Sequence, residues 1–154
     1  AVCFLGCAFF MPFLPALSIR NQSKKNGQAI FFLAYKKPFT FEISYTHSVN
    51  KGRVTDFYSV ENQNIVLEST HFSNYGAGMS DPEPGQTFRS GEGYIEIGNI
   101  NRHFTSINLA VGLVAEHALF FNNKTYWLKD FWPAQSSLII SYRHISIFTY
   151  LRNL

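Results

Sequence analysis

The chain has 154 residues, of which 46% are hydrophobic, and its 13 Lys and Arg residues against 10 Asp and Glu give a net charge of +3. This length suits a single domain with one hydrophobic core. The basic residues are scattered, with doublets only at Lys24-Lys25 and Lys36-Lys37, so the composition does not support a nucleic-acid-binding surface.

The first 19 residues carry no charge and are almost all apolar. A helix of this length would span about 28 Å, close to the hydrocarbon thickness of a bilayer. We therefore expect residues 1–19 to form a signal peptide or membrane-anchor helix, residues 20–27 a polar linker and residues 28–154 the folded domain; a buried core helix is the alternative interpretation of the leading segment. The first interpretation predicts an exported protein, at the outer face of the cytoplasmic membrane or in the extracytoplasmic space. Both cysteines lie in the leading segment, so the rest of the chain would fold without disulfides.

The remaining sequence has the pattern of β-structure. From Phe39 to Thr46, apolar and polar residues alternate with the period of a strand. Other short runs are rich in β-branched and aromatic residues: 29–35, 54–60, 65–72, 94–97, 107–113, 117–121, 126–128, 138–142 and 145–151. Asn122-Asn123 between two aromatic runs is typical of a tight hairpin, because Asn tolerates positive φ. We expect an all-β domain, a single sandwich or small barrel of short antiparallel strands.

The stretch from Ser73 to Gly93 interrupts this pattern. It contains five of the ten glycines, and we expect a long loop without regular structure. Gly76 and Gly78, on either side of Ala77, indicate backbone that needs positive φ or a close approach to another group. Together with the polar segment at residues 45–51, this loop predicts two loops that meet at one end of the domain.

His47 continues the apolar parity of the strand that begins at Phe39, so we expect its ring to point inward and Ser48 to point the other way. The ring either bonds to backbone or a carboxylate as a structural group, or contacts a ligand as a donor or proton acceptor, since histidine titrates near neutral pH. Asp56 shares the inward face of the next strand and could approach Tyr45 or His47.

The sequence does not favour an enzyme. Ser48, His47 and Asp56 have the residue types of a hydrolase, but adjacent residues on a strand face opposite sides and no glycine-flanked nucleophile elbow is present. The five histidines are spread singly, so we predict no metal or cofactor, although a site formed by His47 and His117 in three dimensions stays open. Trp127 and Trp132 either pack in the core or form an exposed docking surface.

The order of several motifs resembles the DUF1850 family. After the apolar leader come Tyr-Thr-His-Ser-Val-Asn-Lys at residues 45–51, Asp-Phe-Tyr at 56–58, Leu-Glu-Ser-Thr-x-Phe at 67–72 and Tyr-Gly-Ala-Gly-Met at 75–79. The resemblance runs over residues 28–151 and includes Asn-x-Asn-Arg at 99–102 and Val-Gly-Leu-Val-Ala-Glu-His at 111–117. Asn50 stands where the family usually has an acid, and Asp56 is a single acid where a pair is common.

The resemblance implies a small bacterial extracytoplasmic protein associated with TAXI-type TRAP transporters, which import organic anions with a solute-binding protein and an ion-driven permease. We therefore expect a membrane-tethered accessory or interaction module that contacts the permease or the solute-binding protein. Its expected working residues are His47, Ser48, Asn50, Lys51, Asp56, Tyr75, Gly76, Ala77, Gly78, Met79 and Arg102. The alternatives are a domain that binds a small anion, with Arg102, Arg53 or Lys51 as counter-charge and His47 as donor, and a hydrolase that uses His47.

Overall fold

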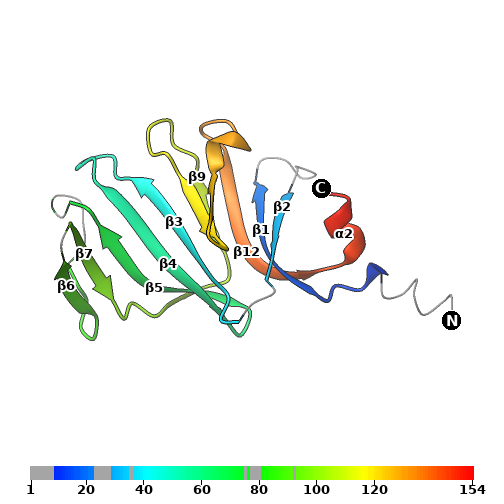
Figure 1. Cartoon of the computed structure of the whole chain (residues 1–154), viewed down its shortest axis with the longest axis horizontal. Coiled ribbons are helices and arrows are strands. Elements are labelled where there is room, and N and C mark those ends of the chain that lie inside the picture. Colours follow the sequence, from blue (N-terminus) through cyan, green and yellow to red (C-terminus); the bar gives the residue numbers. More distant parts are fainter. Residues whose placement is uncertain (1–8, 23–28, 35–36, 75, 77–80, 92) are drawn as a thin grey trace.

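The computed structural model describes residues 9–22, 29–34, 37–74, 76, 81–91 and 93–154. This part of the chain folds into antiparallel strands that form two sheets, as Figure 1 shows. The described residues also contain the short helix α2 (Ile147–Leu151), the 3₁₀ turn η1 (Leu128–Asp130) and two helical residues at Phe9 and Phe10. The expected all-β fold is confirmed.

The larger sheet has the strand order β11-β10-β3-β4-β5-β7-β6, and β8 pairs with the far end of β5. Its strands are β3 (Thr40–Thr46), β4 (Arg53–Glu61), β5 (Asn64–Phe72), β6 (Thr87–Gly91), β7 (Tyr94–Gly98), β8 (Arg102–Phe104), β10 (Ala118–Phe121) and β11 (Lys124–Trp127). Two-residue turns join β4 to β5 and β10 to β11 in this sheet. The predicted hairpin at Asn122-Asn123 is confirmed, with φ values of 49° and 61° between the paired residues Phe121 and Lys124.

The smaller sheet has the order β2-β1-β12-β9. Its strands are β1 (Leu14–Asn21), β2 (Ala29–Leu33), β9 (Ile107–Ala110) and the long curved β12 (Ser137–Ile145), seen beside the larger sheet in Figure 1. Apolar residues of both sheets form one buried cluster, which includes Leu17 and Ile140 from this sheet and Phe41 and Leu119 from the other. The two sheets therefore enclose a common core, and the described strands do not close into the small barrel that was the other expectation.

The leading apolar segment is not the helix that its composition suggests. Leu14–Asn21 is the strand β1, which pairs with β12 on one side and β2 on the other. Leu17 and Ile19 enter the common core, while Ala16 on the opposite face packs with Leu33 and Ile145. A strand covered on both faces has a continuous apolar sequence, which periodicity cannot distinguish from a buried helix. The expected helix is therefore wrong for residues 14–19, the expected linker begins within β1, and residues 1–8 lie outside the described residues.

Among the described helices, none is long and apolar enough to cross a membrane.

Two further expectations are corrected. Residues 145–151 were expected to be a strand, but β12 ends at Ile145 and α2 follows, with the Ser146 hydroxyl accepting a hydrogen bond from the Thr149 amide at 3.1 Å. The stretch 73–93 contains β6, an edge strand whose residues are all exposed. Because β6 buries neither face, its sequence lacks the apolar alternation that would reveal a strand.

Candidate functional site

The two loops singled out in the sequence meet at one end of the sandwich. The side-chain amide of Asn50 donates to the carbonyl oxygen of Asn74 at 3.0 Å. The backbone amide of Arg53 donates to the Ser73 hydroxyl at 2.7 Å, and the Ser73 amide donates back to the Arg53 carbonyl at 2.9 Å. The expected meeting of the loops is thus confirmed at Asn50 and Asn74, whereas Tyr75, Ala77, Gly78 and Met79 lie outside the described residues.

A third loop, residues 111–117, joins this end of the molecule and was not foreseen. The Thr46 amide donates to the carbonyl of Ala115 at 2.6 Å, and the guanidinium of Arg53 reaches the carbonyl of Glu116 at 3.2 Å. Leu113 and Val114 at the tip of this loop are 77% and 78% exposed. We call the three segments 46–53, 73–74 and 111–117 the loop end.

The second terminal nitrogen of the Arg53 guanidinium connects the loop end to the outer face of the larger sheet. It donates to the Ser44 hydroxyl at 2.5 Å, and the guanidinium lies over the ring of Trp127, 5.6 Å from the centroid. Trp132 is buried in the core. A docking surface formed by both Trp127 and Trp132 is therefore wrong, because Trp132 is buried and only Trp127, at 37% exposure, reaches the surface.

A cavity of about 310 Å³ lies below the loop end, on the inner face of the larger sheet. Tyr45, His47, Asp56 and Thr70 line its sheet side, and Arg102 is at its rim. The acids Asp81 and Glu83 and the side chain of Gln86 belong to the segment that covers it. A second cavity, of about 260 Å³, touches the same Tyr45 and Asp56 and extends to β9 and His117. Asp56 and Tyr45 thus stand between two cavities.

Asp56 is the central group of this site. Its carboxylate accepts hydrogen bonds from the hydroxyls of Thr70 at 2.8 Å and Tyr58 at 3.4 Å. Burial raises the pKa of Asp56 above its ordinary value, and the two hydrogen bonds offset only part of that rise. Burial and the nearby charge of Asp56 raise the pKa of Tyr45 to about 12 and also raise that of Tyr58, so both phenols are neutral at pH 7.

His47 lies where the alternation places it, beside Tyr45 in the lining of the cavity. Its Nδ1 accepts from the Val49 amide at 3.3 Å, which fixes the ring against the turn that follows β3. Asp56 lies near Tyr45, one of the two expected neighbours, and its carboxylate is paired with Thr70 and Tyr58. Ser48 is exposed in the turn, so the described contacts bring no serine to His47 for hydrolysis.

The second histidine of the proposed pair, His117, stacks on Tyr45 with the ring centroids 5.6 Å apart. Burial, and then the charge of Arg53, lower the pKa of His117, so this ring is neutral at pH 7. Among the residues that the structure describes, no three His, Cys, Asp or Glu side chains are grouped so that they could hold a metal ion.

The charged groups around the larger cavity determine which ligands suit it. Asp56, Asp81 and Glu83 line it, and Arg102 binds Glu83 at 3.2 Å across the exposed rim. Lys51 is exposed in the turn, and Arg53 lies on the opposite face of the sheet, so neither lines the cavity. The excess of acids suits a ligand that donates hydrogen bonds better than the small anion considered from the sequence.

The comparison with known families bears on this arrangement. The family described as "Domain of unknown function (DUF1850)" matches residues 41–128. This chain belongs to the DUF1850 family. Neither a curated protein nor a solved structure matches it.

The DUF1850 match begins in β3 and ends just after β11, so it contains the loop end and every residue that lines the two cavities. The strands β1, β2 and β12 lie outside the matched segment. In this DUF1850 protein, the smaller sheet thus comes mainly from flanking sequence, which packs on the inner face of the matched strands and closes the core.

Proposed function

We propose that this DUF1850 protein is an extracytoplasmic accessory domain that binds a component of a TRAP-type uptake system through its loop end. The observation that carries this proposal is the group of exposed apolar side chains there. Val49, Leu113 and Val114 are 63%, 77% and 78% exposed, and they stand on two loops that hydrogen bonds hold together. Apolar side chains gathered on an ordered surface are typical of protein contacts.

The partner in this proposal is the ion-driven permease or its solute-binding protein, as the family resemblance implies. The tether is the apolar segment that precedes β1, where Phe10 and Met11 are exposed. Figure 1 shows the described part of this segment, residues 9–13, beside α2 and away from the turn that joins β3 and β4. A domain tethered at one end would therefore present the loop end to its partner.

Replacing both apolar residues at the tip, Leu113→Ser with Val114→Ser, is expected to reduce recovery of the partner from gently solubilised native membranes at least about tenfold. Burying one such side chain contributes about 1.5 kcal/mol or more, and 1.4 kcal/mol corresponds to a factor of ten in affinity. The measurement is quantitative mass spectrometry of the permease and the solute-binding protein that co-purify with the full chain.

The matched control is Leu151→Ser, which removes an apolar side chain of 52% exposure from α2. It should leave recovery unchanged. If the tip variant and the α2 variant retain equal amounts of either component, or if neither component co-purifies with the native chain, the proposed complex is wrong.

A second candidate function rests on Asp56. A carboxylate kept in a cavity at the expense of stability is a common mark of a binding or catalytic site. Its position beside two neutral phenols favours a small ligand with hydroxyl or ammonium donors, bound directly by this domain.

Asp56→Asn is expected to raise the stability of the unliganded protein at pH 7 by on the order of 1 kcal/mol. Asn keeps the acceptor for Thr70 and can donate to the Tyr58 hydroxyl, but it removes the buried charge. The pKa of Asp56 is higher in the folded protein than its ordinary value of 3.8, so the folded state binds its proton more tightly than the unfolded state does. The protonated carboxyl therefore contributes fully to the free energy of unfolding below pH 3.8. This contribution is lost as the pH rises through the folded-state pKa. The stability of Asp56→Asn relative to the native protein should therefore increase between pH 3.8 and the folded-state pKa of Asp56, and the difference should stay constant at higher pH.

Thermal unfolding of both proteins from pH 3 to pH 8 measures this difference. Thr55→Val, on the opposite face of the same strand, supplies a control that should show no pH-dependent difference. A variant with Asp56→Asn that is less stable at every pH would show that the carboxylate is a structural group.

A further inference from the structure

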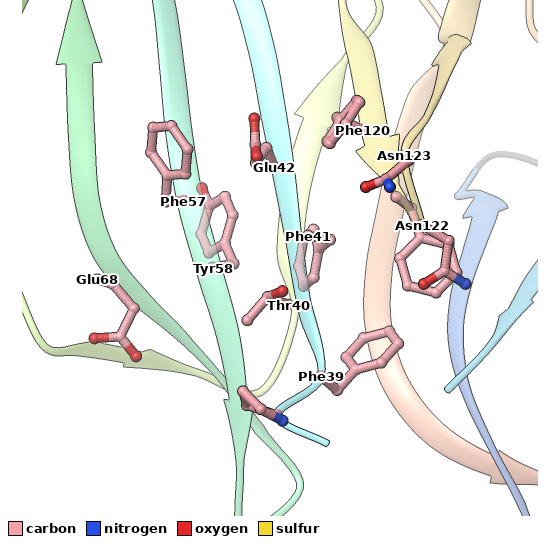
Figure 2. A pocket seen from close by; sticks show the side chains of 12 residues that line it. Phe39, Thr40, Phe41, Glu42, Phe57, Tyr58, Glu68, Phe120, Asn122 and Asn123 are labelled. Carbon is pink, nitrogen blue, oxygen red and sulfur yellow. The ribbon is translucent and has the colours of Figure 1, made fainter. Parts of the chain in front are cut away.

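A groove of about 420 Å³ lies on the outer face of the larger sheet, turned away from the core. Figure 2 shows its floor, where Glu42 of β3 stands between the aromatic rings of Phe57 and Phe120. The alternation along the strands places these side chains outside. Phe41, Tyr58 and Leu119, which precede or follow them, are buried in the core. The sheet itself therefore separates this groove from the Asp56 cavities.

The strand register explains the position of Glu42. Glu42 is paired with Phe57 of β4 on one side and with Phe120 of β10 on the other. Directly opposed residues on neighbouring strands have Cβ atoms about 5 Å apart. The carboxylate is therefore flanked on both sides by apolar rings, and this partial burial raises the pKa of Glu42.

The groove carries negative charge that the described residues do not neutralise. Glu42 forms none of the ion pairs or hydrogen bonds found in the described part of the chain. Glu68, the other acid in the lining, accepts a hydrogen bond of 2.5 Å from the Ser59 hydroxyl. No Lys, Arg or His is among the described residues that line the groove. A partly buried carboxylate that has no counter-charge among the described residues favours a cation from outside.

We propose that this groove binds a small organic cation, a substituted ammonium, with Glu42 as its counter-charge and the rings of Phe57 and Phe120 on its two sides. The strands β4 and β10 each lie about 4.8 Å from β3. A cation above Glu42 would thus be about 5 Å from each of the two strands that carry the rings, which is comparable with the range of about 6 Å over which cation–π attraction acts.

The spacing also sets the size of the head group. The two strands that carry these rings lie about 10 Å apart, one on each side of β3. A methylated ammonium fills that gap and contacts both rings, whereas a bare metal ion would touch neither ring and would find too few oxygen ligands. The side chains of Thr40 and Asn123 at the margins offer polar contacts to the rest of such a ligand.

The test is an NMR titration of the backbone amides of the full chain with choline chloride, at an ionic strength held constant with sodium chloride. The neutral isostere 3,3-dimethylbutan-1-ol is titrated in parallel. We expect saturable shifts for choline that centre on Glu42, Phe57 and Phe120. The alcohol, which lacks the charge, should bind at least about tenfold more weakly.

Two variants separate the charge from the rings. Glu42→Gln keeps the shape of the groove and should weaken choline binding about tenfold, while Phe120→Leu should weaken it several-fold. Glu61→Gln is the matched control, because Glu61 is exposed at the end of β4 outside the groove lining, and it should bind choline as the native chain does.

Three results would overturn the proposal: no saturable shift with choline, equal affinity for choline and the neutral alcohol, or native affinity in Glu42→Gln. Circular dichroism establishes that each variant is folded before titration. Should Glu42→Gln fail to fold, the comparison of choline with the alcohol on the native chain, together with Phe120→Leu, still decides the matter.

Discussion

Leu17→Ala is expected to lower the free energy of unfolding by about 3 kcal/mol and the Tm by about 10 °C. Leu17 is fully buried in β1, where it is paired with Tyr142 of β12 and Phe32 of β2. Shortening a large side chain at the centre of a packed sheet removes apolar contacts and leaves a cavity that the surrounding strands cannot close. Urea unfolding of the full chain, followed by tryptophan fluorescence, gives the value.

The control is Arg20→Ala on the same strand. Arg20 is exposed, so its replacement should change stability by no more than about 0.5 kcal/mol. The comparison distinguishes a structural strand from a detachable leader, because a leader would tolerate both changes equally. Equal stability of the two variants would show that residues 14–21 are not part of the folded domain.

The sequence predicted best those strands that bury only one face. In β3 the alternation of Phe41, Ile43 and Tyr45 with polar residues gave the strand, its inner face and the inward position of His47. The same parity in β4 placed Asp56 beside Tyr45. The sequence of a half-buried strand indicates which face is buried, because every second residue must be apolar.

The strands that are buried on both faces or exposed on both faces were predicted worst. β1 is covered on both faces, so its apolar residues follow one another without alternation and resemble a helix. β6 is exposed throughout and shows no apolar residues in alternation at all. The run at 145–151 has β-branched and aromatic residues typical of a strand, yet Ser146 caps a helix there, whose Tyr150 packs against the cluster of Ala16 and Ile145. Tertiary packing overrode local propensity in that segment.

Parts of the sites arise only from contacts between distant segments. Within the loop end, residues 111–117 are held by Thr46 and Arg53, which are more than sixty positions away in sequence. No local sequence pattern predicts contacts between segments so far apart. The groove around Glu42 did leave a signal. Phe57 and Phe120 each stand next to residues of inward parity, so alternation alone assigns both rings to the outer face, although their aromatic character suggests core packing.

The roles of the glycines also depend on contacts between distant segments, which the local sequence does not reveal. One of them leads to the second prediction with a large expected effect on stability. The sequence indicated Gly76 as a position that needs positive φ or a close approach to another group, but a Cβ built there meets no described atom within 4 Å. Gly52 is the residue at which a close approach occurs. A Cβ there would lie 2.9 Å from the Cβ of Asn74 and 3.1 Å from the Ser73 hydroxyl oxygen.

Gly52→Ala is accordingly expected to destabilise the protein by about 2 kcal/mol, because the two loops must separate to admit one methyl group. Gly52 is buried, and the atoms in the way belong to a short loop that Asn50 and Arg53 hold by hydrogen bonds. Amide hydrogen exchange should report the separation as faster exchange at Ser73, whose amide donates to Arg53.

Gly76→Ala provides the matched comparison, since it adds the same methyl group where space is open, and it should change stability by no more than about 0.5 kcal/mol. Equal stability of the two alanine variants, with unchanged exchange at Ser73, would contradict a tight junction between the loops. The loss of stability in Gly52→Ala alone would instead place the constraint on the loop end at Gly52. Gly52→Ala would also leave the apolar side chains of Leu113 and Val114 in place while it loosens the junction of the loops. Partner binding to this variant would therefore report how far binding depends on loop geometry. The Leu113→Ser, Val114→Ser variant reports how far binding depends on the apolar side chains themselves.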